Sequence, residues 1–265
     1  MTNKYFNKEY IDYWKKTTTN VNDEYKVPGE DAQNIFIKEL NISSQDLILD
    51  LGCGYGRLYP ILSRLTQSIV GVDVDEDIIK EASAYPYLKL VRSSAEETLL
   101  PSCHFDKIIS WATYDAAEQG KALIEENRIL KKNGLLLITG KNKDYYDDDS
   151  KAFIAERNAK LKNFPNYFTD VYGLIKDIDL FGYKVIKSYG FPRRGDFGNL
   201  RYFNILGEKI KFYEFILILQ KVNESKINNC NICYEYSDAA FALAKNNNFE
   251  NPKLFFQWHK ENHHE

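Results

Sequence analysis

Short runs of apolar residues alternate along the chain with segments in which apolar residues recur at helical spacing. The runs cover residues 47–51, 69–73, 87–91, 105–110, 135–139, 183–189 and 212–219, and each has the length of a strand. Helical spacing is found at residues 30–40, 58–65, 75–84, 118–132, 151–161 and 170–181. Asn133-Gly134 indicates the end of the fourth of these helices. The alternation predicts an α/β fold with a largely parallel sheet and helices on both faces.

A glycine-rich loop follows the first apolar run, which is interrupted only by Asp50. Gly52, Gly54 and Gly56 alternate along it, and a helical pattern begins directly beyond. Glycine lets the backbone turn sharply and lets a ligand approach where a Cβ would collide. The free backbone N–H groups of the helix start lie next to the loop. A strand, glycine loop and helix in this order predict a nucleotide-type binding site.

The second apolar run ends in a carboxylate, Asp73, about 20 residues beyond the first glycine. A βαβ unit places an acidic side chain there against the two hydroxyls of a ribose. The alternative role for Asp73 is a helix N-cap, for which Asp75 and Asp77 compete. We expect Asp73 to bind ribose.

The loop has the spacing Gly-x-Gly-x-Gly, whereas dinucleotide-binding loops have Gly-x-Gly-x-x-Gly. The sequence resembles the class I S-adenosylmethionine-dependent methyltransferases over about residues 30–220. Their ordered motifs are matched by Leu-Asp-Leu-Gly-Cys-Gly-Tyr-Gly at 49–56, Val-Asp at 72–73, Ser-Ser-Ala-Glu-Glu at 93–97, and segments 105–111 and 130–138. The resemblance implies a Rossmann-like, seven-stranded doubly wound sheet, mostly parallel with an antiparallel last strand.

The resemblance also implies S-adenosylmethionine as the cofactor, lying across the carboxyl ends of the parallel strands. Where many relatives carry an aspartate for the adenine amino group, Ser94 is found here, so that contact passes to Glu96 or to backbone. An aromatic N-terminal helix often closes over the cofactor in relatives. The expected cofactor contacts are Asp50, Gly52, Cys53, Gly54, Gly56, Asp73, Val74, Ser94, Ala95, Glu96 and Trp111, with Tyr13 and Trp14 as lid candidates. Packing is the alternative role for Trp111 and for the two lid residues.

Two insertions, at about residues 141–169 and 190–211, leave carboxyl ends of strands and are expected to cap the acceptor. Arg193, Arg194 and Arg201 in the second insertion predict an anionic acceptor, because guanidinium groups bind carboxylate or phosphate with paired hydrogen bonds. Exposed surface arginines are the alternative. Tyr145 and Tyr146 are further acceptor candidates in the first insertion. Asp115, Tyr114 and His104 lie near strand ends and are weak candidates for a general base, which a hydroxyl acceptor would require.

Composition narrows the class of acceptor. The net charge of −3 over 265 residues gives no basic field for nucleic acid or membranes. The position after the fourth strand reads Ser-Trp-Ala-Thr-Tyr, which lacks both the Asp/Asn-Pro-Pro motif and the Pro-Cys motif of DNA methylases. No apolar run has the length of a membrane span, and the start lacks the apolar core of a signal peptide. We therefore expect a cytoplasmic enzyme with a small acceptor, such as a phosphorylated or nucleotide-linked glycan precursor, and O-methylation is favoured.

The remaining features leave alternatives open. Cys230 and Cys233, with His259, His263 and His264, could form a zinc site, but unrelated thiols are the preferred interpretation. The acidic run at 147–149 is expected to be solvated, so no metal is predicted. Residues 1–220 are expected to form the methyltransferase domain, and 221–265 a helical extension packed on it. Self-association, an NAD-type oxidoreductase and a non-catalytic cofactor-binding module stay open as alternatives.

Overall fold

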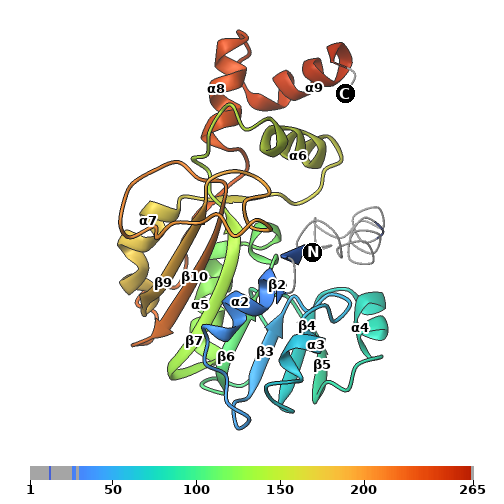
Figure 1. Cartoon of the computed structure of the whole chain (residues 1–265), viewed down its shortest axis with the longest axis vertical. Helices are drawn as coiled ribbons and strands as arrows, with labels where there is room; N and C mark the ends of the chain where they lie inside the picture. Colours follow the sequence, from blue (N-terminus) through green and yellow to red (C-terminus); the bar gives the residue numbers. More distant parts are fainter. Residues whose placement is uncertain (1–11, 13–25, 28–29, 264–265) are drawn as a thin grey trace.

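The computed structural model describes residues 12, 26–27 and 30–263. A sheet of seven strands forms its centre (Figure 1). Its order is β5 (Lys89–Arg92), β4 (Ile69–Asp73), β3 (Ile48–Leu51), β6 (Phe105–Ser110), β7 (Leu130–Lys141), β10 (Glu214–Lys221) and β9 (Tyr183–Phe191). Strands β3 to β7 are parallel, whereas β10 runs antiparallel to both of its neighbours. The predicted Rossmann-like sheet with an antiparallel last strand is confirmed.

The side chains of the central strands alternate between the two faces of the sheet. Ile48 and Ile216 belong to one apolar core, which α2 (Ala32–Lys38) and α3 (Tyr59–Leu62) cover. Leu49 and Leu217 belong to the opposite core, which α5 (Gln119–Ile129) and α7 (Val171–Asp177) cover. Because both faces are buried, the central strands appear in the sequence as continuous apolar runs.

The remaining elements surround this sheet. They are β1 (Lys26–Val27), β2 (Glu30–Asp31), α4 (Glu76–Ala82), the 3₁₀ helices η1 (Tyr114–Ala116) and η2 (Ile178–Phe181), α6 (Ser150–Leu161), β8 (Phe168–Thr169), β11 (Cys233–Tyr234), α8 (Asp238–Asn246) and α9 (Pro252–Asn262). Among the described residues, no helix combines the length and apolar character needed to cross a bilayer.

One predicted boundary is wrong. Helix α5 ends at Ile129, and Asn133-Gly134 lies inside β7 rather than at the end of a helix. Asn133 has φ +65°, and the register of β7 against β6 shifts between Phe105 and Lys107. Asn133 and Gly134 therefore mark an irregularity within β7. Asn and Gly are also preferred at the C-terminal ends of helices, which explains the wrong prediction.

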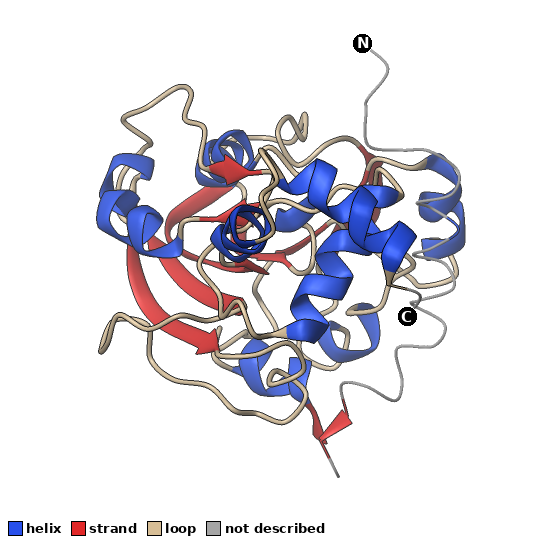
Figure 2. Cartoon of the chain, turned by 90° about the horizontal axis from the view of Figure 1, so that it is seen from above, coloured by secondary structure: helices blue, strands red, loops and turns tan. Residues whose placement is uncertain are grey.

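The first insertion and the C-terminal segment form a separate layer beyond the carboxyl ends of the parallel strands, at the top of Figure 1. Phe153 of α6 packs against Phe255 and Phe256 of α9, with ring centroids 5.8 and 5.3 Å apart. Glu156 of α6 accepts hydrogen bonds from the backbone and hydroxyl of Ser237, the N-cap of α8. Viewed from above, the helices of this layer lie over the ends of the strands (Figure 2). Phe255 and Phe256 are thus buried side chains of α9.

Candidate functional site

The glycine loop after β3 has the backbone conformations that glycine alone adopts readily. Gly52 and Gly54 have φ of +73° and +51°. A Cβ on Gly52 would lie 2.0 Å from the hydroxyl oxygen of Thr113, so this glycine permits close packing of two loops. A Cβ on Gly54 would meet no described atom within 4 Å. The loop is therefore closed on the side of Gly52 and open at Gly54.

Asp73, at the carboxyl end of β4, fastens this loop from the neighbouring strand. Its Oδ2 accepts from the backbone N–H of Gly54 at 3.0 Å, and its Oδ1 accepts from Val74 and Asp75 at 2.8 and 3.2 Å. Burial raises the pKa of the carboxyl group, and the three backbone donors oppose that rise. The N-cap role belongs to Asp75, whose Oδ1 accepts from Asp77 and Ile78.

Asp50, near the carboxyl end of β3, is a fully buried carboxyl group. It is 1% exposed, and the Tyr87 hydroxyl donates to its Oδ2 at 2.9 Å. Burial raises its pKa to about 7, although the hydrogen bond from Tyr87 and the charge of Arg57 oppose this. A cation placed beside such a carboxyl group favours its ionised form.

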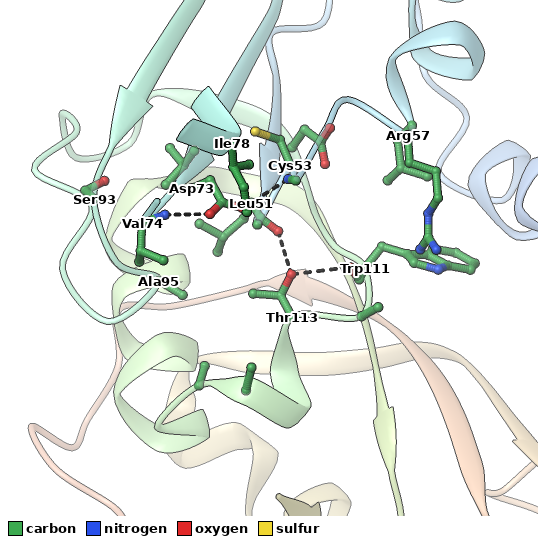
Figure 3. A pocket seen from close by; sticks show the side chains of 18 of the residues that line it. Leu51, Cys53, Arg57, Asp73, Val74, Ile78, Ser93, Ala95, Trp111 and Thr113 are labelled. Atoms are coloured by element: carbon green, nitrogen blue, oxygen red, sulfur yellow. Dashed lines mark hydrogen bonds between the residues drawn. The ribbon is translucent and has the colours of Figure 1, made fainter. Parts of the chain in front are cut away.

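A pocket opens between the ends of β3, β4 and β6 (Figure 3). Of the expected cofactor contacts, the structure brings together those that line it: Asp50, Gly52, Cys53, Gly54, Asp73, Val74, Ala95, Glu96 and Trp111. Gly56 and Ser94 do not line it. Ser93 does, beside Ala95, while Ser94 forms a bridge with Glu97.

Several residues that line the pocket were not predicted from the sequence. Two of them, Arg57 and Thr113, make contacts that shape the pocket. The Arg57 side chain extends against the Trp111 indole (Figure 3). The Thr113 hydroxyl donates to the Leu51 carbonyl at 3.0 Å and so ties the loop after β6 to the glycine loop. The signal for Arg57 was its position directly after the third glycine of the loop.

The candidate bases do not line the pocket. Tyr114 is fully buried and donates to the Gln119 carbonyl. His104 precedes β6 and therefore lies at the opposite end of the parallel strands from Asp50 and Asp73. Asp115 pairs with Lys141 at 2.5 Å, behind the pocket wall formed by Thr113 and Ala116. Tyr114 and Asp115 both follow the carboxyl end of β6, which is the end of the sheet where an acceptor is expected.

The predicted acceptor residues are not equivalent. Arg193 forms a double hydrogen bond with Asp148 at 2.6 and 3.1 Å and lies over the Tyr146 ring. Arg194 donates to the Tyr213 hydroxyl at 3.0 Å. Tyr145 is fully buried.

Other candidates fall elsewhere. Arg201 is exposed, and Tyr13 and Trp14 lie outside the described residues. The Cys233 thiol accepts from the Gln119 backbone and donates to the Ala117 carbonyl. Within the described part of the chain, no group of three or more metal-ligating side chains is found.

The polar, apolar and charged groups that line the pocket suit the corresponding parts of S-adenosylmethionine. The carboxyl group of Asp73, a group that can accept hydrogen bonds from hydroxyls, lies beside an apolar wall of Val74, Ile78 and Ala95 that suits a flat ring. The open side of Gly54 leaves the backbone accessible to a ligand. Asp50, an acid, and Arg57, a cation, both line the same pocket and offer hydrogen-bond partners for the amino and carboxylate groups of the cofactor.

Comparison with known proteins agrees with this geometry. Residues 49–138 match the family described as a methyltransferase domain. An uncharacterised protein of Methanocaldococcus jannaschii is 28% identical over 184 residues, which cover 68% of this chain and 60% of that protein. A ubiquinone biosynthesis O-methyltransferase of Pelagibacter ubique is 31% identical over 118 residues, which cover 40% of this chain and 49% of the relative. The chain thus spans about half to three fifths of these relatives.

Solved structures show the same fold. A methyltransferase from Thermotoga maritima superposes with a TM-score of 0.56 at 16% identity, covering 81% of this chain and 97% of its own. The family match lies on the segment from β3 to β7 that builds the pocket. The chain therefore contains a domain of the class I S-adenosylmethionine-dependent methyltransferase family.

Proposed function

We propose that this protein transfers a methyl group from S-adenosylmethionine to an oxygen of a small acceptor. The observation that carries the proposal is Asp73, a half-buried carboxyl group that closes β4 and holds the glycine loop beside an open pocket. O-methylation is supported by the name of the Pelagibacter ubique relative and by that of a second ubiquinone biosynthesis O-methyltransferase, from Bradyrhizobium diazoefficiens, which is 28% identical over 114 residues.

S-adenosylmethionine supplies a methyl group on a positively charged sulfur, so the cofactor itself is already activated. The chain's residues then chiefly bind and orient. Asp73 would accept hydrogen bonds from the ribose hydroxyls, while Asp50 and Arg57 would hold the charged amino-acid end. Orientation of this kind can contribute roughly 7–11 kcal/mol to lowering the barrier. We assign Asp73, Asp50 and Arg57 this positioning role.

A small acceptor is supported by what covers the ends of the strands. The segments at 141–169 and 190–211 cross over the ends of β7 and β10 (Figure 1). A layer in this place would leave little room for a duplex, and the net charge of −3 offers no basic surface field. We also assign residues 1–220 to the methyltransferase domain, with 221–265 as an extension that covers its first insertion.

Calorimetry with S-adenosylhomocysteine tests the cofactor, and transfer of a labelled methyl group from S-adenosylmethionine to a pool of small metabolites tests the reaction. We expect binding of S-adenosylhomocysteine and a labelled small-molecule product. Thermal stabilisation by NAD, with none by S-adenosylhomocysteine, would favour an oxidoreductase instead. Cofactor binding without transfer to any pool would support a non-catalytic module.

A further inference from the structure

The loop after β6 contains a strained turn at a wall of the cofactor pocket. Ala112 has φ +54°, in the left-handed region that residues with a side chain seldom adopt. Of the eight described residues other than glycine with positive φ, four are asparagines, which tolerate this region. Of the other four, Ala112 alone lines the pocket. A strained residue in such a place persists only where surrounding contacts hold it.

Thr139 of β7 holds this turn. The backbone N–H of Ala112 donates to Thr139 Oγ1 at 2.8 Å. The regular pairing of β6 with β7 ends just before this contact, at Ser110 and Ile138. The Thr139 hydroxyl therefore continues the link between the two chain segments where their backbones no longer pair. Thr139 itself faces Ile216 of β10 in the antiparallel register, so the sheet fixes its backbone.

The residues on either side of the turn both line the pocket. Trp111 is 8% exposed, and Figure 3 shows the Arg57 side chain extending against its indole. The Thr113 hydroxyl donates to the Leu51 carbonyl at the end of β3. A different backbone conformation at Ala112 would rotate one of these two side chains relative to the other. Both contacts therefore depend on the turn.

Thr139 does not line the pocket, so its influence on a ligand would act through Ala112. A protein that holds its binding-competent conformation only part of the time binds with an affinity that is lowered by that fraction. A side chain that holds a strained turn in the competent conformation therefore raises the affinity without contacting the ligand.

We propose that Thr139 is a positioning residue for the cofactor. Its hydroxyl holds the left-handed turn at Ala112, and the turn keeps Trp111 and Thr113 in the pocket wall where S-adenosylmethionine binds. The inference rests on the proposed function, because it gives a residue outside the pocket a role in binding the cofactor of that same site. The wall is thus formed before the cofactor arrives, which lowers the cost of binding.

The test is isothermal titration calorimetry of the whole chain with S-adenosylhomocysteine. Thr139→Val keeps the shape of the side chain and removes its hydrogen-bond acceptor. We expect this variant to bind roughly three- to tenfold more weakly, the range that one hydrogen bond contributes. Thr139→Ser retains a hydroxyl and should recover most of the affinity.

A double-mutant cycle with Ala112→Gly tests whether the turn is the cause. Glycine adopts positive φ without the steric cost of a Cβ, so the turn would no longer depend on the Thr139 hydroxyl. We expect Ala112→Gly to improve binding at least about threefold more in the Thr139→Val protein than in the original chain. A hydroxyl that only stabilised the sheet would give no such coupling.

Thr66→Val is the matched control. The hydroxyl of the buried Thr66 accepts from the backbone N–H of Ser68 at 3.1 Å, ahead of β4 and so at the opposite end of the parallel strands. This variant should lower the melting temperature and leave the affinity for S-adenosylhomocysteine unchanged. An unchanged affinity in Thr139→Val, an equal loss in Thr66→Val, or a cycle without coupling would overturn the inference. Failure of the original chain to bind S-adenosylhomocysteine would instead count against the proposed function itself.

Discussion

Asp73 has two tasks at once, because its carboxylate holds the glycine loop and faces the pocket. Asp73→Asn keeps the size of the side chain and removes its charge. We expect S-adenosylhomocysteine to bind about 1.5–3 kcal/mol more weakly, the range for hydrogen bonds to a charged group. Isothermal titration calorimetry measures this change.

Asp75→Asn is the control for that variant. Asp75 lies two residues further along the chain, caps α4 and does not line the pocket. Because asparagine is also a good N-cap residue, the stability should change little, and the affinity for S-adenosylhomocysteine should be unaltered. Equal losses of affinity in both variants would show that the ribose assignment of Asp73 is wrong.

Asp50 should make the stability depend on pH. Its carboxyl group has a pKa of about 7 in the folded protein against an ordinary value of 3.8. A raised pKa means that folding favours the protonated form, so this contribution is complete below about pH 4 and is lost as the pH rises to about 7. Relative to Asp50→Asn, the free energy of unfolding should fall by up to about 1.4 kcal/mol per pH unit in this window. Urea denaturation of both proteins measures it, and parallel pH profiles would contradict the shift.

The loop after β3 owes its shape to glycines with different tasks. Gly52→Ala would place a Cβ 2.0 Å from Thr113 Oγ1, so we expect a clear loss of thermal stability. Gly54→Ala meets no described atom, and its positive φ costs only about 1–2 kcal/mol. We expect Gly54→Ala to fold but to lose affinity for S-adenosylhomocysteine, because the new methyl group would point into the space for the ligand. Thermal melts with and without ligand separate these outcomes; Gly54→Ala binding as well as the original chain would contradict them.

At the scale of elements, the sequence predicts what depends on local pattern. The runs that become β3, β4 and β6 are continuous because both faces of these strands are buried, and their positions follow directly. The start of β7 was missed because Ile129 and Leu130 are both buried, and apolar character does not separate the last turn of a helix from the first residues of a strand.

The candidate site shows the same difference between residues that a local pattern predicts and residues that depend on tertiary contacts. Asp50 and Asp73 were predicted because Asp50 interrupts one apolar run near its end, Asp73 ends another, and the parallel sheet brings strand ends together. The contacts of Arg194 and Glu214 join segments far apart in the chain, and no local spacing in the sequence encodes such contacts. The sequence likewise could not distinguish Arg193, which Asp148 holds, from its neighbour Arg194.

At the scale of the whole molecule, α8 and α9 are joined to the first insertion by an aromatic core. Phe256 is fully buried and packs against Phe153 of α6. Phe256→Ala should reduce the free energy of unfolding by about 3–5 kcal/mol in one cooperative transition. Phe241→Ala, on the exposed side of α8 with half of its surface accessible, should change it by no more than about 0.5 kcal/mol.

Calorimetric scanning of these two variants tests whether the extension and the sheet form one folding unit. Two separate transitions, with only the smaller one moved by Phe256→Ala, would show that residues 221–265 fold apart from the methyltransferase domain. A single transition that moves as a whole would support their assignment as a layer of the same unit.

The most direct test of the account is a crystal structure of the whole chain with S-adenosylhomocysteine. We predict the nucleoside across the carboxyl ends of β3 and β4, with both ribose hydroxyls on Asp73. A ligand bound elsewhere, or a pocket filled by side chains of the protein itself, would contradict the proposed activity.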